Sequence, residues 1–138
     1  MKNLLQILLF ISPIFSISQN VSDLITSGLQ KHINSDYKGA INDYNKALKE
    51  NPISAIIFTE RGSSKLKLGH KEAAINDFNK AIKIDSNYAD AYLKRGNLKY
   101  TIGDYNGAIK DYNNVIRINS NNSKVFYNRA NSKYALGD

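Results

Sequence analysis

The sequence contains no cysteine, no tryptophan, two prolines and a single methionine among its 138 residues. The absence of cysteine excludes disulfide bonds, thiolate metal sites and cysteine nucleophiles. The two histidines, His32 and His70, lack the i, i+4 spacing of a helical zinc site, so we expect no metal and no cofactor. Neither a glycine-rich phosphate loop nor a G-x-S-x-G elbow occurs. We therefore expect that the chain is not an enzyme.

Blocks of like charge are also missing, although 19 Lys and Arg residues outnumber 12 Asp and Glu residues and give a net charge of +7. This balance would suit an anionic partner such as nucleic acid or an envelope polymer. The basic residues are spread evenly along the chain, however, which favours a solvated surface. An apolar share of 42% is enough to bury a core.

A long apolar run occurs only near the N-terminus. Lys2 precedes a run from Leu4 to Phe15, which is shorter than the roughly 20 residues needed to span a bilayer. Ser16 and Ser18 place small residues at the two positions that a signal peptidase recognises. The sequence therefore predicts that residues 1–18 are a signal peptide, cleaved between Ser18 and Gln19. The mature protein would be periplasmic or secreted, with membrane contact limited to the signal peptide. The alternative is an uncleaved anchor.

Like residues fall into register when the sequence is shifted by 34 positions. The matching sets are Gly28, Gly62, Gly96 and Ala130; Ala40, Ala74 and Ala108; and Tyr44, Phe78 and Tyr112. Such a period is typical of a repeat architecture, in which each unit covers the apolar face of its neighbour.

Each unit is predicted to be a helical hairpin. Apolar residues recur at three- and four-residue spacing on both sides of the pair Gly103-Asp104. Gly103 can end one helix in the left-handed conformation, and Asp104 can cap the next helix. Gly96 and Ala108 have little or no side chain where the two helices approach closely.

The unit resembles the tetratricopeptide repeat family. The family pattern is met by Tyr92, Gly96, Tyr100, Gly103, Ala108, Tyr112 and Val115, with Ser120 where the family usually has proline. The resemblance implies an all-α fold, a right-handed superhelical solenoid of antiparallel helix pairs. Three repeats would occupy residues 21–54, 55–88 and 89–122, and residues 123–138 would form the first helix of an incomplete fourth repeat. Two turns depart from the pattern, because Ser35 replaces the turn glycine and His70 replaces the capping acid.

The last residue, Asp138, matches Asp36 and Asp104, each of which stands at the start of a second helix. We therefore expect that the natural chain continues with at least one more helix. The segment could then be the repeat region of a longer enzyme or receptor.

Two charged positions also recur with the period. The acids are Asp43, Asp77 and Asp111, and the bases are Arg61, Arg95 and Arg129. If the second helix of one repeat packs on the first helix of the next, each Asp would meet the following Arg, and a bidentate pair would fix the angle between repeats. This interpretation predicts the pairs Asp43–Arg61, Asp77–Arg95 and Asp111–Arg129. The alternative is solvated surface charge, worth under about 1 kcal/mol per pair.

The resemblance also implies a concave groove lined by the first helices. The predicted partner-binding residues are Lys94, Asn97, Tyr100, Lys124, Tyr127, Asn128 and Asn131. Asparagine can bond a peptide backbone, and tyrosine gives contact area at low entropy cost. Asn97 and Asn128 match the asparagines of the clamp with which some members hold a terminal carboxylate, but Leu93 stands where its first lysine could be.

We therefore predict an exported, non-enzymatic scaffold that binds a protein or peptide through this groove. The alternative is a basic helical solenoid that binds an anionic polymer, either an envelope glycan or, less readily for an exported protein, nucleic acid.

Overall fold

The structure is a computed structural model that describes residues 19–137. The predicted signal peptide lies outside the described residues. Every regular element in the described range is a helix, which confirms the predicted all-α class. The chain divides into two compact units, the first ending at Ile53 and the second beginning at Ser54. No helix within residues 19–137 combines the length and the apolar character needed to cross a bilayer.

The first unit is a helical hairpin, formed by a helix over residues 19–33 and by α2 (Tyr37–Glu50). The helices approach closely at Gly28, where an added Cβ atom would lie 2.6 Å from Cε1 of Tyr44. Ser35 has a φ of 63° in the turn, and Asp36 caps α2 by accepting a 2.9 Å hydrogen bond from the backbone N–H of Gly39. Ser35 and Asp36 thus form a tight connection, although Ser35 replaces the turn glycine.

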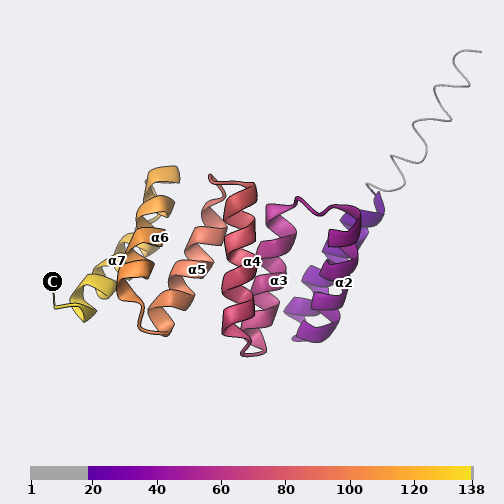
Figure 1. Cartoon of the computed structure of the whole chain (residues 1–138), viewed down its shortest axis with the longest axis horizontal. Coiled ribbons are helices and arrows are strands. Elements are labelled where there is room, and N and C mark those ends of the chain that lie inside the picture. The colour runs from indigo at the N-terminus through magenta and orange to yellow at the C-terminus, as the bar shows by residue number, and fades with distance from the viewer. Residues whose placement is uncertain (1–18, 138) are drawn as a thin grey trace, which may run out of the picture. The chain divides into compact units, whose positions relative to one another are not determined.

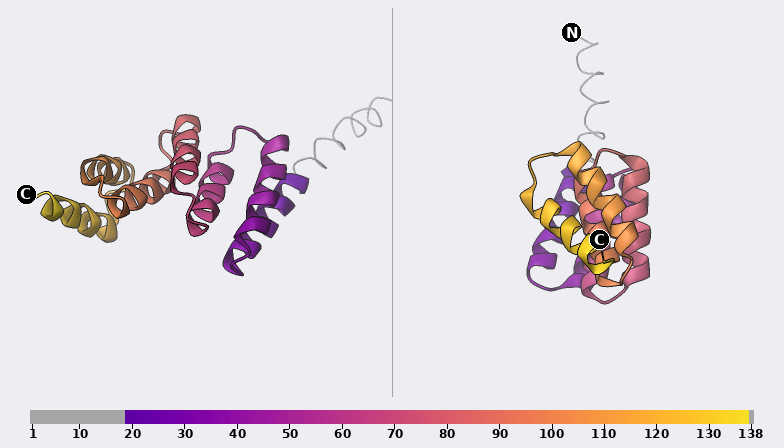
Figure 2. Two further views of the ribbon diagram at one scale, coloured as in Figure 1. Left: turned by 60° about the horizontal axis from the view of Figure 1, so that its bottom comes forward. Right: turned by 90° about the vertical axis from the view of Figure 1, so that its left-hand side faces the viewer.

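The second unit contains five helices among the described residues. They are α3 (Ala55–Lys67), α4 (Lys71–Ile84), α5 (Ala89–Thr101), α6 (Tyr105–Ile118) and α7 (Ser123–Ala135). Helices α3 and α4 form one hairpin and α5 and α6 form the next, while α4 contacts α5 and α6 contacts α7 (Figures 1 and 2). Because α5 also contacts both α3 and α7, the first helices of the hairpins lie along one side of this unit.

The hairpin turns follow the predicted chemistry. Gly69, Gly103 and Gly137 have φ values of 82°, 84° and 82°, a region that residues with a Cβ atom rarely adopt. Asp104 accepts a 2.9 Å bond from the N–H of Gly107 and so caps α6. His70, which replaces the capping acid, precedes α4 without a capping side-chain hydrogen bond.

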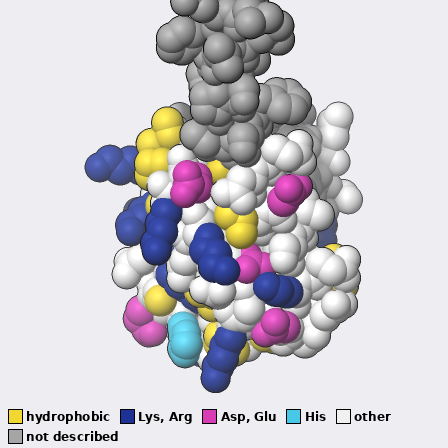
Figure 3. Space-filling view, turned by 90° about the vertical axis from the view of Figure 1, so that its right-hand side faces the viewer, with side chains coloured by type: hydrophobic (Ala, Val, Ile, Leu, Met, Phe, Trp, Pro, Cys, Tyr) yellow, Lys and Arg dark blue, Asp and Glu magenta, His cyan; other side chains and the backbone are white. Residues whose placement is uncertain are grey.

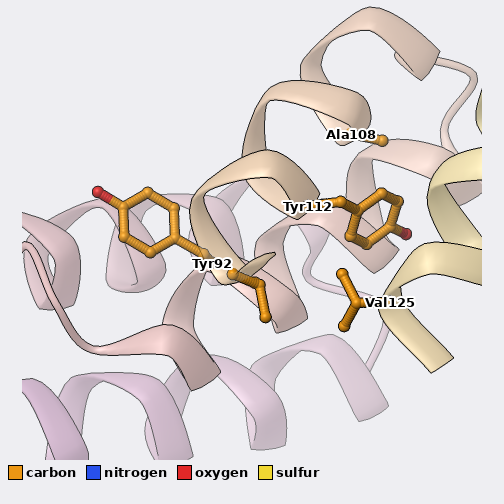
Figure 4. Close-up of a cluster of buried hydrophobic side chains, with 5 residues drawn as sticks. Tyr92, Ala108, Tyr112 and Val125 are labelled. Carbon is orange, nitrogen blue, oxygen red and sulfur yellow. The ribbon is translucent and has the colours of Figure 1, made fainter. Parts of the chain in front are cut away.

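Small residues face large ones inside each hairpin of the second unit. Tyr112 is 1% exposed, and a Cβ atom at Gly96 would lie 2.9 Å from its Cε1 atom. Gly62 faces Phe78 in the same way. Figure 4 shows the Tyr112 ring directed toward Val125 of α7, so one aromatic side chain packs against both its own hairpin and the next helix.

Two of the three predicted ion pairs between consecutive repeats are wrong. Arg61 binds Asp77 with Nε and Nη2 at 2.9 and 2.7 Å, and Arg95 binds Asp111 in the same way at 2.9 and 2.6 Å. Each pair thus joins the two helices of one hairpin. Asp77 pairs with Arg61 rather than with Arg95, and Asp111 pairs with Arg95 rather than with Arg129. The third predicted pair, Asp43–Arg61, would join the two units and stays a prediction.

The close helix approach explains this pairing. Gly96 lacks a side chain, so the Cβ atom of Asp111 can come within 3.2 Å of the place where a Cβ of Gly96 would be. The carboxylate therefore lies beside Arg95, the residue next to Gly96. The contact of Arg95 with the preceding repeat is made by Nη1, which donates a hydrogen bond to the side-chain oxygen of Asn79 in α4.

A second donor completes each carboxylate site. Lys65 lies 2.7 Å from Asp77 and Lys99 lies 3.0 Å from Asp111, measured from the lysine Nζ to a carboxylate oxygen. In the first unit, Ser27 and Lys31 each bind Asp43 at 2.6 Å. Burial raises the pKa of Asp43, but these two hydrogen bonds and the charge of Lys31 outweigh it and leave the pKa below its usual value.

Candidate functional site

A pocket of about 220 Å³ lies in the second unit, between α5, α6 and α7. Every side chain that lines it is neutral. The lining residues are Asn97, Tyr100, Thr101, Tyr112, Asn128 and Asn131. The first helices α5 and α7 supply all of them except Tyr112, which comes from α6.

Asn97 is the centre of the hydrogen bonds in this pocket. Its Oδ1 atom accepts a 2.9 Å bond from the Tyr112 hydroxyl and a 3.1 Å bond from Nδ2 of Asn128. Both lone pairs of this oxygen are thereby used. The orientation of the amide is fixed, and its Nδ2 group, which has no acceptor among residues 19–137, stays available for a ligand.

Tyr112 is a buried residue whose hydroxyl binds the side chain of Asn97. Burial, together with the nearby Tyr100 and Asp111, raises the pKa of Tyr112 to about 12. The phenol therefore keeps its proton throughout the neutral range and acts as the donor to Asn97. Since the ring is packed between Gly96 and α7, this donor has little freedom to move.

Tyr100 and Asn131 form the open side of the pocket. Tyr100 is 38% exposed, and its ring meets the ring of Tyr105 edge-on at 5.4 Å between centroids. Thr101 donates from Oγ1 to the Asn97 backbone oxygen at 2.9 Å. The Asn131 amide makes no hydrogen bond to the described part of the chain, so it adds one free donor group and one free acceptor to the pocket.

The structure brings four of the seven predicted groove residues together, namely Asn97, Tyr100, Asn128 and Asn131. Lys94 lies outside the pocket, because its Nζ binds Glu60 at 3.2 Å and the Ser63 hydroxyl at 3.0 Å.

The other two predicted residues also lie outside the pocket lining. Lys124 is exposed, and Tyr127 has an exposed fraction of 66%. Lys124 and Tyr127 belong to α7, the helix that supplies Asn128 and Asn131. Neither side chain takes part in the hydrogen bonds around Asn97.

Tyr112 is a pocket residue that the sequence did not indicate as a ligand contact. Its position is the aromatic core position of the repeat, and the sequence gives only a packing role to that position. One signal was present: the second repeat has Phe78 at the matching place, and the first repeat has Leu29 at the place of Asn97, so only the later hairpin combines a phenolic hydroxyl with an asparagine. The hydroxyl, not the ring, connects the core to the pocket.

The arrangement can bind but shows no reactive group. Amides and hydroxyls offer hydrogen bonds to a neutral polar ligand, and the tyrosine rings offer contact area. Within residues 19–137, no cluster of three or more His, Asp or Glu side chains could hold a metal ion.

Comparisons with known proteins agree with this architecture. The first TPR of Spaghetti (RPAP3), solved bound to the HSP90 peptide SRMEEVD, superposes with a TM-score of 0.83 at 26% identity, covering 88% of this chain and 96% of that one. The first TPR domain of human RPAP3 gives a TM-score of 0.80 at 26% identity, with 85% and 92% covered. The Arabidopsis OM64 TPR domain gives 0.81 at 22% identity, with 86% and 98% covered.

The sequence itself also matches a family. A search of curated proteins finds no match. A family model described as TPR repeat matches residues 62–103 and 96–137, which together make up more than half of the chain. With the period of 34 residues, the paired helices and the small-against-aromatic packing of each hairpin, these matches show that the chain belongs to the tetratricopeptide repeat family.

Proposed function

We propose that the protein is an exported, non-enzymatic scaffold that holds an extended segment of a partner protein in the pocket around Asn97. The observation that carries this proposal is the network of Tyr112, Asn97 and Asn128. It fixes one amide by two hydrogen bonds and leaves the complementary groups, Nδ2 of Asn97 and Oδ1 of Asn128, free for a ligand.

These free groups suit a peptide. A peptide unit presents one N–H donor and one C=O acceptor, and an asparagine amide can pair with both. Because the two asparagines belong to neighbouring helices, a bound chain would run across α5 and α7 and bond to each in turn. Tyr100 then adds contact area at low entropy cost.

The pocket favours an uncharged segment. None of its lining side chains is a cation. Lys94, the basic residue of α5 that was predicted to line the groove, is already neutralised by Glu60 and by Asp90 at 3.4 Å. The peptide SRMEEVD held by the first TPR of Spaghetti (RPAP3) carries acidic residues. We therefore propose a neutral polar ligand here rather than an acidic terminus.

The distribution of charge argues against the alternative of an anionic polymer. Arg61, Lys65, Arg95 and Lys99 are engaged with buried carboxylates. On the face shown in Figure 3, Lys and Arg side chains are interspersed with Asp and Glu. A polymer needs a continuous basic track to release its counterions.

The test uses peptides selected on the immobilised protein from a random library. We expect the double variant Asn97→Ala, Asn131→Ala to weaken binding of a selected peptide by about tenfold or more, since each lost hydrogen bond contributes roughly 1 kcal/mol. The matched control is Asn106→Ala, an exposed asparagine on α6 outside the pocket, which should bind as the unaltered protein does.

Ionic strength separates the two functions. Affinity for the selected peptide should change little between 50 and roughly 200 mM salt, whereas polymer binding through phosphates or other anions falls steeply over this range. An affinity that falls steeply as salt rises and is unchanged in the double variant would refute the proposal. Export is a separate part of the proposal and rests on the signal peptide predicted over residues 1–18. An exported form whose mass includes Met1 would contradict the predicted cleavage between Ser18 and Gln19.

A further inference from the structure

The hydrogen bond between Asn97 and Asn128 leaves a donor and an acceptor side by side between α5 and α7. Oδ1 of Asn97 accepts from Nδ2 of Asn128 at 3.1 Å. The free Nδ2 of Asn97 and the free Oδ1 of Asn128 are attached to the same carbon atoms as this bonded pair, so they lie next to it in the pocket lining. We call these two free groups the amide pair. It offers one donor and one acceptor to a ligand.

The amide pair does not recur in the preceding repeat. Lys94 stands 34 positions before Asn128 and donates to the Ser63 hydroxyl at 3.0 Å. Ser63 in turn stands 34 positions before Asn97. Lys94 also lies 3.2 Å from Glu60, so a charged side chain and its partner occupy the matching place between α3 and α5. The packing of the repeat therefore does not require the amide pair.

The size and the charge of the pocket restrict what can enter it. Its volume of about 220 Å³ is below the roughly 300 Å³ at which small-molecule sites usually begin, so it suits a single side chain. A charged group would lose hydration without meeting an opposite charge, because every lining side chain is neutral. An apolar group would leave the amide pair without partners. The best occupant is a neutral side chain with both a donor and an acceptor.

A primary carboxamide meets this requirement better than a main-chain peptide unit does. The N–H and the C=O of a trans peptide unit point in opposite directions. The oxygen and the NH2 group of a carboxamide lie along one edge, with which asparagine and glutamine side chains also bind adenine. One such edge can accept from Asn97 and donate to Asn128 together. Since Nδ2 of Asn97 has two hydrogens and Oδ1 of Asn128 has two lone pairs, both can still bond to the main chain.

We infer that the pocket selects a glutamine or asparagine side chain in the segment that the protein binds. The inference rests on the proposed function and adds the residue type that the bound segment must contain. Asn97 and Asn128 determine the specificity, because they supply the two groups that pair with the carboxamide edge. Tyr112 positions them through its hydrogen bond to Asn97.

The experiment titrates the full chain with capped tripeptides, acetyl-Gly-Xaa-Gly N-methylamide, in which Xaa is Gln, Glu or Met. The N-methylamide end leaves the Gln side chain as the sole primary carboxamide of the series. Nuclear magnetic resonance follows the side-chain NH2 signals of Asn97 and Asn128. We expect saturable shifts with the Gln peptide. The Glu and Met peptides should bind about tenfold more weakly or worse, because their side chains are of similar length but lack the NH2 donor.

The Asn97→Asp variant makes the test specific. Aspartate keeps the shape of the side chain and an oxygen for the bonds from Tyr112 and Asn128, but it replaces the free donor with a second acceptor. Two acceptors match the two donors along one edge of a guanidinium. The variant should therefore prefer an Arg peptide to the Gln peptide, the reverse of the unaltered protein. The matched control, Asn106→Asp on the exposed side of α6, should keep the preference for Gln.

Three results would overturn the inference. They are an absence of shifts with the Gln peptide, equal affinities for the Gln, Glu and Met peptides, and an unchanged preference in Asn97→Asp. The proposed function survives each of them if a library-selected peptide still loses affinity in the Asn97→Ala, Asn131→Ala protein. N-acetylglucosamine is the competing probe, because it is neutral and carries an acetamide. If it shifts the same signals at a lower concentration than the Gln peptide does, the pocket selects a sugar and the inference is wrong.

Discussion

Replacing Asp111 with alanine is expected to destabilise the second unit by about 3 kcal/mol, because it leaves Arg95 and Lys99 facing each other without their carboxylate. Asp111 is 2% exposed, and it accepts two bonds from Arg95 and lies 3.0 Å from Lys99. The two cations are partly exposed and can regain some water. The expected loss therefore lies at the lower end of the range for broken buried pairs. Chemical denaturation measures it.

The control is Asp90→Ala, which removes an acid of α5 whose side chain is 40% exposed and which pairs with Lys94 in the i, i+4 register. An exposed pair of this kind contributes under about 1 kcal/mol. If Asp111→Ala and Asp90→Ala lower the free energy of unfolding equally, the buried carboxylate does not join the hairpin as the structure indicates.

Replacing Tyr112 with alanine is expected to cost about 3–5 kcal/mol, the range for removing a large aromatic side chain from a core. The ring is buried between Gly96 and Val125, so its loss opens a cavity between α5, α6 and α7. The same change removes the donor to Asn97. The Tyr112→Ala variant should therefore lose both stability and peptide binding.

The variant Tyr112→Phe separates the two roles of Tyr112. It keeps the ring, as Phe78 does in the preceding hairpin, and should lower the free energy of unfolding by no more than about 1.5 kcal/mol, the upper value for one hydrogen bond. Peptide affinity should still fall, because Asn97 is then held only by Asn128. A Phe variant with unchanged affinity would show that the hydroxyl does not organise the pocket.

The helices and their turns could be predicted from the sequence because their causes are local. The period of 34 residues, the helical spacing of apolar residues and the Gly-Asp turn each act within one hairpin. His70 illustrates this: it stands in the sequence where the capping acid is expected, and α4 has no capping side-chain hydrogen bond.

The pairing of charges could not be predicted in the same way. Asp77 lies 16 residues after Arg61 and 18 before Arg95, and Asp111 lies at the same spacings between Arg95 and Arg129. Spacing alone does not distinguish them. The choice depends on the close approach at Gly62, where the Cβ atom of Asp77 lies 3.2 Å from the place of an added Cβ atom.

The pocket could be predicted only in part. Family positions indicated Asn97, Tyr100, Asn128 and Asn131, all of which line it. They could not show that the Lys94 side chain binds Glu60 and Ser63, since these contacts depend on the distances between α3 and α5.

The most direct test of the account is to map where a selected peptide binds, by comparing backbone amide hydrogen exchange with and without saturating peptide. The account predicts slower exchange confined to α5 and α7 around Asn97 and Asn131, with the outer surface of α6 near Asn106 unchanged, and no such protection in the Asn97→Ala, Asn131→Ala protein. Protection centred on the outer surface of α6, or protection that persists in the double variant, would contradict the claim that this pocket is the binding site.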